Sequence, residues 1–413
     1  MNKIISPKLN LAFAFYLVAV PIWVMILGLF NIDCNAGHFI IIFACIYFFT
    51  FFISLLNYLL KGGKLNFKLL NNKFCYVMIA MMVIILISCL VNNVFTMDIL
   101  VYFAYFLIVV CVCNLDNKWQ KIIINTFIGV LVFSCVLSFI SPYIKLDIFN
   151  QKNHPMALQF LNPNYSAHII SAITSIVFIM FNGTNTKLKH WFYGVAYLIF
   201  ITFLFMNGSF ISITALIVVE IFSQIFIGVK YKKFQYKMFI LFVLLIPVCF
   251  LVDLIPQIEV IRTCKYNYFL ECVAVFDNVF NTNILSCFNI TTVPGADGWT
   301  RNQLVSNAID FITDNPKNFI FGAGAGTLYS IKPHNLILSL WIEFGLFLPI
   351  LFVVLFVMIF TKLIKSKFKE DKFIFTAPII VFLICYIVIS FVMQSSWVFV
   401  MLSSMLAKRV IQD

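Results

Sequence analysis

The sequence predicts an all-α, polytopic membrane protein with about 12 transmembrane helices. Of the 413 residues, 63% are hydrophobic and 11% are charged, and the mean hydropathy is +1.03. A soluble domain carries roughly a quarter charged residues, so this chain lacks the polar surface that a water-facing globule needs. The apolar runs are also long and uninterrupted, which favours helical spans over the short alternating strands of a β-barrel.

Taken in order, the apolar stretches give twelve candidate spans. The first follows a basic start at Lys3 and Lys8 and is too long for a cleavable signal peptide, so we expect an uncleaved span. Three stretches, 99–113, 191–206 and 395–407, are shorter than a full crossing usually requires. The twelve stretches are 11–30, 38–60, 74–91, 99–113, 122–142, 165–182, 191–206, 210–229, 238–255, 335–361, 373–392 and 395–407.

The charge of the connecting loops alternates along the chain. Most of the 28 basic residues lie in every second loop, whereas the other loops carry more acids than bases. The positive-inside rule assigns the basic set to the cytoplasm, with both termini inside. The net charge of +12 is then a topology signal and a source of contacts with anionic lipid, not a nucleic-acid footprint. The basic set includes Lys3, Lys8, Lys73, Lys118, Lys121, Lys187, Lys189, Lys362, Lys408 and Arg409.

The spans divide the chain into four regions. Residues 1–160 and 161–255 hold the N-terminal and central transmembrane helices, 256–334 form one large external loop, and 335–413 hold the C-terminal helices. The large loop contains a predicted amphipathic helix near 301–313, followed by a turn region rich in proline and glycine. Loops of this length in a compact fold are usually functional.

Arginine occurs at only three positions, Arg262, Arg301 and Arg409. The first two lie in the large external loop of a chain that otherwise uses lysine. A guanidinium group binds phosphate oxygens in a bidentate way that an ammonium group cannot, which favours a phosphate site. Surface salt bridges to acids of the same loop would explain these arginines equally well.

His334 stands at the start of an apolar helix. Pro333 fixes the entry of that helix, so His334 and Asn335 are predicted at its N-terminal end. There the helix dipole favours a neutral imidazole, which can accept a proton near neutral pH. A helix-cap or interface role is the alternative for a lone histidine. Glu343 and Glu220 lie inside predicted spans, where a carboxylate is either functional or paired with another span.

Three further features bear on the external surface. The glycines of FGAGAG, residues 321–326, permit either an anion nest or a tight turn. Asn164 and His168 begin a span after ordinary turn chemistry. One disulfide is expected in an oxidising compartment and Cys272–Cys287 is the favoured pair, although sequence alone does not fix the pairing. No cysteine or histidine spacing fits a structural zinc site.

Four motifs follow one another in the C-terminal half, about residues 160–360. They are NPNYSAHIISAI, MNGSFISITALIVVE, GWTRNQLVSNAIDFITDNPKNFIFGAGAGTLY and PHNLILSLWIEFGLFLPILF. In this order they resemble the bacterial O-antigen ligase/polymerase family, whose members are multi-span inner-membrane proteins that handle polyprenyl-linked glycans. The last two resemble the family's order of an arginine, an amphipathic helix, a proline, Gly-x-Gly and a His-Asn helix. Phe210 follows Ser209 where many members have an arginine.

The resemblance implies a metal-independent glycosyltransferase that needs no cofactor. It would transfer a glycan from undecaprenyl pyrophosphate to a sugar hydroxyl at the periplasmic face of the bacterial inner membrane. His334 would be the general base and Arg301 would bind the pyrophosphate. The substrate-binding candidates are Arg262, Lys332, Asn335, Gly324, Asn164 and Ser209.

Three functions follow from these expectations. The first is a surface-polysaccharide polymerase, which the missing arginine after Ser209 favours over the second, an O-antigen ligase that transfers the chain to lipid A–core. The third is a flippase or transporter, which would place ionisable groups along a mid-bilayer path between related halves. The expected partners are the lipid-linked oligosaccharide, the bilayer and a chain-length regulator protein, and not nucleic acid.

Overall fold

The computed structural model describes residues 7–29, 49, 51–62, 73–94, 98–141, 158, 163–184, 186–207, 209–231, 236–245, 247, 301–325, 335–365, 370–386 and 393–412. In this part of the chain the regular secondary structure is helical throughout. The stretches long and apolar enough to cross a membrane are Asn117–Ile140, Asn164–Gly183, Lys187–Asn207, Ile211–Val229 and Phe347–Lys365. The all-helical class and the membrane character are thereby supported, and the count of twelve spans stays a prediction.

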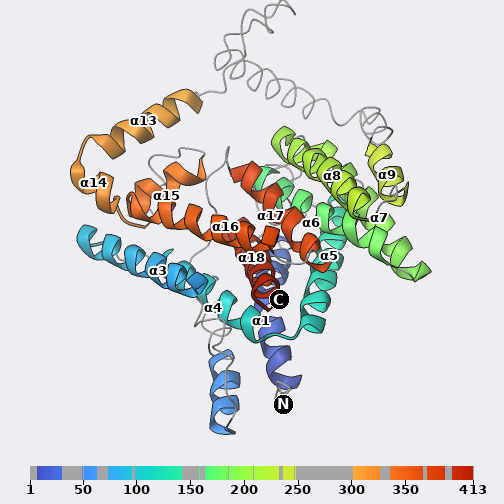
Figure 1. Ribbon diagram of the computed structural model, residues 1–413, viewed down its shortest axis with the longest axis horizontal. Coiled ribbons are helices and arrows are strands. Elements are labelled where there is room, and N and C mark those ends of the chain that lie inside the picture. The colour runs from blue at the N-terminus through green and yellow to red at the C-terminus, as the bar shows by residue number, and fades with distance from the viewer. Residues whose placement is uncertain are drawn as a thin grey trace, which may run out of the picture.

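The described helices follow the predicted apolar stretches in order (Figure 1). The amphipathic helix predicted near 301–313 is confirmed as α13. An unlabelled helix covers Phe51–Leu60. The labelled helices are α1 (Pro7–Leu29), α3 (Lys73–Asn92), α4 (Asp98–Asn114), α5 (Asn117–Ile140), α6 (Pro163–Gly183), α7 (Lys187–Asn207), α8 (Phe210–Tyr231), α9 (Tyr236–Val243), α13 (Arg301–Thr313), α14 (Pro316–Phe321), α15 (Leu336–Phe344), α16 (Phe347–Lys365), α17 (Glu370–Tyr386) and α18 (Met393–Gln412).

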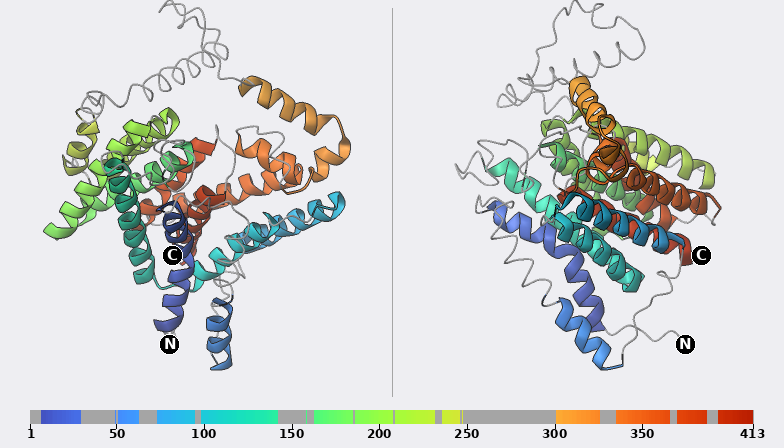
Figure 2. Two further views of the ribbon diagram at one scale, coloured as in Figure 1. Left: turned by 180° about the vertical axis from the view of Figure 1, so that it is seen from behind. Right: turned by 90° about the vertical axis from the view of Figure 1, so that its left-hand side faces the viewer.

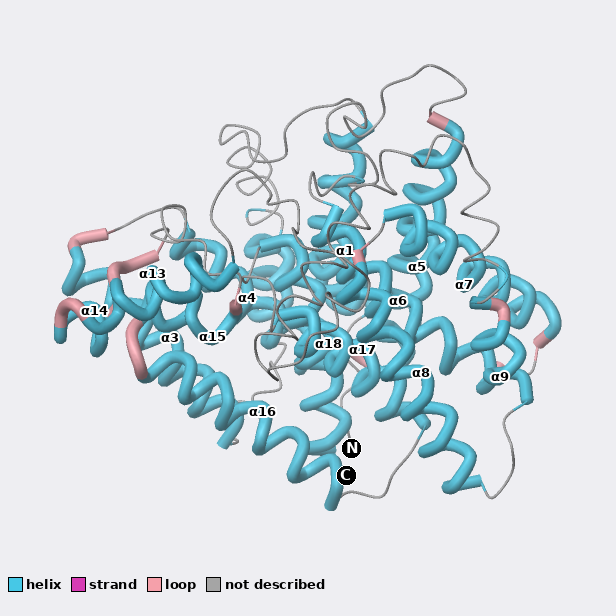
Figure 3. The backbone as a smooth tube through the Cα atoms, turned by 90° about the horizontal axis from the view of Figure 1, so that it is seen from above, coloured by secondary structure: helices cyan, strands magenta, loops and turns pink. Residues whose placement is uncertain are grey.

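Helix α6 lies in the middle of the bundle, where it packs against α7, α8 and α17 (Figure 3). Its buried surface includes small side chains such as Ala167, Ser171, Ala172 and Ser175. Small residues let neighbouring helix backbones approach closely, which is how helices associate without a hydrophobic driving force in lipid. The serine hydroxyls are satisfied within the helix, because Ser171 Oγ donates to His168 O at 3.1 Å and Ser175 Oγ to Ala172 O at 2.7 Å.

The outward faces of the peripheral helices are also apolar. Ile87 on α3, Phe222 and Ile225 on α8, and Val353 and Val357 on α16 are all exposed. A helix that is apolar on every side is either buried in a large protein core or faces lipid. These helices lie at the outside of the bundle, so lipid is the solvent that their exposed faces fit (Figure 2).

Polar contacts join several helix ends at one end of the bundle. Asn10 Nδ2 of α1 donates to Asp116 Oδ2, before α5, at 2.8 Å. Lys408 Nζ of α18 donates to Val112 O of α4 at 3.0 Å. Lys362 Nζ of α16 lies 5.1 Å from the centre of an aromatic ring at the start of α3. These contacts connect helix ends that are next to the lysine-rich loops. The charge pattern assigns all of these loops to the cytoplasmic side of the membrane.

The predicted continuous span 335–361 is instead two helices, α15 and α16, which meet at Gly345 and Leu346. Gly345 has a φ of +79°, which favours glycine. A Cβ atom at this position would lie 2.0 Å from Ile320 O of α14. Leu346 N–H then donates to Phe319 O at 3.0 Å, so α14 occupies the break between the two helices. Periodicity did not reveal this break because both halves are equally apolar.

We expect Gly345→Ala to destabilise the protein by more than about 2 kcal/mol, since it adds positive-φ strain to a backbone clash. The measurement is the thermal midpoint of the purified chain in detergent. Gly129→Ala is the matched control, because a Cβ on Gly129 in α5 meets nothing within 4 Å and alanine favours the helix. Equal midpoints for the two variants would contradict the close packing at the break.

Candidate functional site

Helices α13, α14 and α15 form one small packed unit beside the bundle (Figure 1). Its core consists of Ala308 and Ile312 of α13 and Ile342 of α15, all almost fully buried. Phe319 of α14 and Trp341 of α15 pack around this core, with ring centroids 5.2 Å apart. Trp341 Nε1 also donates to Phe319 O at 3.0 Å. The apolar face of the amphipathic helix is therefore buried against the helix that Asn335 begins.

Asn335 is the N-cap of α15. Its Oδ1 accepts a hydrogen bond from Leu338 N at 3.1 Å, and its carbonyl oxygen accepts one from Ser339 Oγ at 2.6 Å. An N-cap side chain satisfies a backbone donor that has no partner within the helix. The predicted position of Asn335 at the N-terminal end of the helix is confirmed, and its amide oxygen has a structural role there.

Several predicted site residues lie outside the part of the chain that the structure describes. Arg301 is the first residue of α13, and its side chain is not described. His334 immediately precedes Asn335, the N-cap of α15, in the sequence. The residues outside the described ranges are Arg262, Lys332, His334, Cys272 and Cys287.

The glycine-rich turn after α14 packs against the end of α15. Gly322 N–H donates to Asn318 O at 2.9 Å, Ala323 N–H to Ile342 O at 2.7 Å, and Gly324 N–H to Glu343 O at 2.9 Å. Gly322 and Gly324 both have positive φ, at +69° and +94°. These three N–H groups are used by backbone carbonyls, which favours the tight-turn interpretation over an anion nest at Gly324.

Side chains from α3 and α4 bind this turn to the bundle. Ser88 Oγ donates to Glu343 O at 2.9 Å, and Asn92 Nδ2 donates to Gly322 O at 3.1 Å. Tyr102 OH donates to the Glu343 carboxylate at 3.0 Å. Glu343 is buried, so this contact pairs a carboxylate that would otherwise be costly in an apolar setting. Ser88 and Asn92 are polar residues near the end of an apolar stretch, which is the only sequence signal for their role. Their partners, Glu343 and Gly322, are more than 200 residues away, so the neighbouring sequence does not indicate them.

A second polar cluster joins α6, α8 and α17. Ser209 Oγ lies 2.9 Å from Ser212 Oγ, and the Cys385 thiol hydrogen-bonds with the hydroxyls of Ser171 and Ser212. Ser209 is buried beside Ser212, the residue through which α8 contacts Cys385 of α17. His168 of α6 is fully buried, and within the described residues neither of its ring nitrogens has a hydrogen-bond partner.

Asn164, the other candidate from this region, lies in the first turn of α6 and is half-buried.

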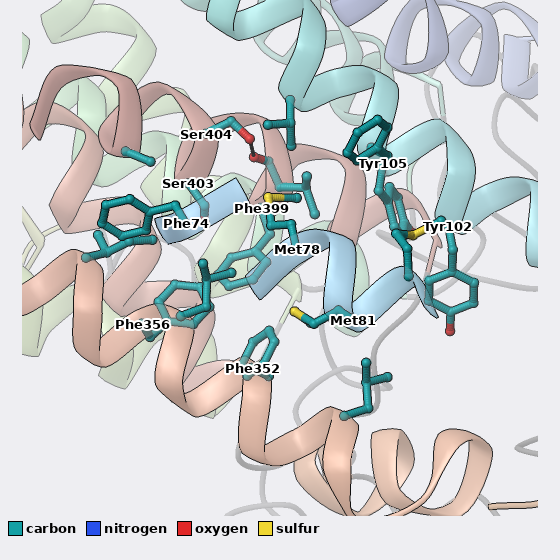
Figure 4. Close-up of a pocket in the computed structure, with 18 of the residues that line it drawn as sticks. Phe74, Met78, Met81, Tyr102, Tyr105, Phe352, Phe356, Phe399, Ser403 and Ser404 are labelled. Carbon is teal, nitrogen blue, oxygen red and sulfur yellow. Dashed lines mark hydrogen bonds between the residues drawn. The ribbon is translucent and has the colours of Figure 1, made fainter. Parts of the chain in front are cut away.

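An apolar cavity of about 150 Å³ lies between α3, α4, α15, α16 and α18. Figure 4 shows Tyr102 at one end of the cavity and Phe74 toward the other, with Phe352 and Phe356 along one wall. The Tyr102 ring thus lines the cavity while its hydroxyl binds Glu343. Hydrophobic side chains dominate the lining, which fits an apolar ligand better than a polar one.

The described part of the chain is helical and has helices long and apolar enough to cross a membrane, which is consistent with a membrane protein. A polar site lies where the turn 322–325 and the end of α15 meet α3 and α4. Among the described residues, no group of three or more His, Cys, Asp and Glu side chains could hold a metal ion. No protein-family model, characterised protein or solved structure matches the chain. The particular function is accordingly inferred from the motifs and from the site.

We expect Tyr102→Phe to destabilise the protein by about 1–3 kcal/mol, because a hydrogen bond to a buried carboxylate is lost. Thermal midpoints in detergent measure the effect. In a Glu343→Met background the same tyrosine substitution should cost much less, since the carboxylate acceptor is absent. A full cost in both backgrounds would show that the hydroxyl acts through some other group.

Proposed function

We propose that the chain is a surface-polysaccharide polymerase that acts on undecaprenyl-pyrophosphate-linked glycans at the periplasmic face of a bacterial inner membrane. The observation that carries this proposal is the packed unit of α13, α14 and α15. It joins the helix that begins with Arg301 to the helix whose N-cap follows His334. The two segments that the family resemblance singles out are therefore parts of one structure.

In the proposed reaction, a sugar hydroxyl of the incoming lipid-linked repeat unit attacks the anomeric carbon of the growing chain. The bond between that carbon and the pyrophosphate oxygen breaks, and undecaprenyl pyrophosphate leaves with the electron pair. His334 accepts the hydroxyl proton, and Arg301 stabilises the charge that develops on the pyrophosphate. The product is a chain longer by one unit on the acceptor's own carrier lipid.

The apolar cavity beside Tyr102 supports a lipid-linked substrate. It begins next to the Glu343 site and extends between α3 and α16 toward Phe74. A stretch of isoprenoid chain fits its lining of aromatic, methionine and aliphatic side chains. Such binding would leave the pyrophosphate and the glycan at the end of the bundle where α13 and α15 lie.

The helix ends support the proposed sidedness. The end that unites Asn10, Asp116 and Lys408 adjoins the lysine-rich loops, which the positive-inside rule assigns to the cytoplasm. The turn 322–325 contacts the opposite end of α3 at Asn92, and Ser88 of α3 binds Glu343 of α15 beside it. The catalytic unit is then periplasmic, and both termini are cytoplasmic.

Contacts of the buried carboxylates favour an enzyme over a flippase. Glu220 of α8 accepts a hydrogen bond from Tyr197 OH of α7 at 3.0 Å, and Glu343 accepts one from Tyr102. Glu220 does not line either of the two cavities described for the molecule. A transport path would place such groups along a polar passage.

Deletion of the gene followed by a surface-glycan gel tests the proposed function. A polymerase defect leaves a single repeat unit on lipid A–core, because ligation continues without chain growth. A ligase defect instead leaves bare core and strands polymer on the carrier lipid. Unchanged long chains in the deletion strain would refute both functions.

His334→Ala, expressed in the deletion strain, should fail to restore long chains. Loss of a general base lowers the rate by about a hundredfold or more, which the glycan gel detects as missing polymer. His190→Ala is the control, since His190 stacks on Phe181 of α6 at the opposite end of the bundle. Protein amounts are compared on an immunoblot. If the His334→Ala protein is equally abundant and still produces long chains, His334 is not the general base.

Arg301→Lys should be nearly as damaging as Arg301→Ala, because an ammonium group cannot bind two phosphate oxygens in the bidentate manner of guanidinium. The readout is again chain length in the deletion strain. Lys317→Ala, which removes an exposed cation from α14, serves as the control. Polymer at the wild-type level from Arg301→Lys would show that charge alone suffices.

A further inference from the structure

A second cavity, of about 260 Å³, lies at the opposite end of the bundle from the turn 322–325. Five helices enclose it, namely α5, α6, α7, α17 and α18. It lies next to the contacts between Arg409 and Gln120 that tie α18 to α5. The proposed reaction uses nothing at this end, so the cavity needs a separate explanation.

The lining of this second cavity is basic. Lys121 of α5, Lys189 of α7 and Arg409 of α18 all contribute to it, and none of its described lining residues is acidic. Asn125 and Tyr193 add polar groups, and Tyr193 OH donates to Asn125 Oδ1 at 2.9 Å. Three cations around one small cavity repel one another unless an anion or solvent screens them. The cavity is thus electrostatically suited to an anion.

The arginine of this cavity is oriented by contacts with Gln120 and Phe375. Arg409 is 9% exposed, and its Nε and Nη2 atoms donate to Gln120 Oε1 at 3.4 and 3.3 Å. Its guanidinium carbon lies 5.5 Å from the centre of the Phe375 ring. A planar guanidinium oriented in this way matches phosphate oxygens better than a mobile ammonium does.

Both kinds of helix end adjoin the cavity. The cavity lies beside the N-terminal ends of three helices, since Lys121, Lys189 and Ile374 belong to the first two turns of α5, α7 and α17. The N-terminal end of a helix carries a partial positive charge and exposes backbone N–H groups. Met180 and Gly183 of α6 and Arg409 of α18 lie in the last turns of their helices, whose C-terminal ends carry a partial negative charge. The lining cations are therefore the main source of the positive field.

We propose that this cavity, lined by Lys121, Lys189 and Arg409, binds a phosphate group, carried by an anionic lipid headgroup or by a free phosphorylated solute. Basic pockets between transmembrane helices on the cytoplasmic side bind anionic headgroups in this manner. The volume suits a headgroup and not a whole lipid, so the acyl chains of a bound lipid would lie outside it. This binding site is independent of the glycan site.

The test uses the full chain purified in a neutral detergent. One arm titrates phosphatidylglycerol against a phosphatidylcholine background and counts bound lipid by native mass spectrometry. The other arm measures the thermal midpoint as inorganic phosphate is added. The double variant Lys121→Ala/Lys189→Ala removes two lining cations that are exposed, so the fold is retained. Lys118→Ala/Lys187→Ala is the matched control, since it removes two exposed lysines of the same helices outside the lining.

We expect the cavity variant to bind its ligand roughly tenfold more weakly than the wild type, and the control to bind within about twofold of it. An effect on phosphatidylglycerol alone identifies a lipid headgroup, and an effect on inorganic phosphate identifies a free phosphorylated solute. Both results support the site. Equal binding by wild type, variant and control, or equal losses in variant and control, would overturn it, because net charge alone would then explain any binding.

Discussion

The backbone contact between the turn 322–325 and the end of α15 is the constraint on which the rest of the site depends. Ala323 and Gly324 donate to the last carbonyls of α15, and α14 fills the gap that Gly345 opens before α16. Those carbonyls have no partner inside their own helix, so the contact satisfies groups that would be costly to bury in lipid. Because α14 continues from α13, the same contact fixes the amphipathic helix beside the start of α15.

Polar side chains are few in this chain, and the structure uses them where helices meet. Asn92 of α3 binds the turn, Ser88 of α3 and Tyr102 of α4 bind Glu343 of α15, and a hydroxyl and thiol cluster links α6, α8 and α17. In an apolar solvent these contacts gain value because water cannot replace a lost partner. The buried His168, with no hydrogen-bond partner among the described residues, departs from this pattern. Two cavities differ in the same respect: the one beside Tyr102 is lined mainly by apolar side chains, and the one beside Arg409 is lined by basic and polar side chains.

Composition and run length predicted the helical membrane class, and amphipathic spacing predicted α13, because both depend on averages over many residues. The position of Asn335 followed from the nearby Pro333, because proline favours the start of a helix. The break at Gly345 and the Glu343–Tyr102 pair could not be read in the same way. They depend on segments distant in sequence, α14 against α16 and α4 against α15, and a single chain carries no local signal of such pairing.

The proposed function is a glycosyl transfer with two products, the longer glycan and undecaprenyl pyrophosphate. The most direct measurement therefore follows both products in a purified system. The chain is reconstituted into liposomes with an undecaprenyl-pyrophosphate-linked oligosaccharide, and the glycan and the carrier lipid are each quantified by mass spectrometry. The account predicts longer glycans, with undecaprenyl pyrophosphate released in step with each unit joined. An oligosaccharide that crosses the bilayer unchanged, with no release of the carrier, would contradict it and would identify a transporter instead.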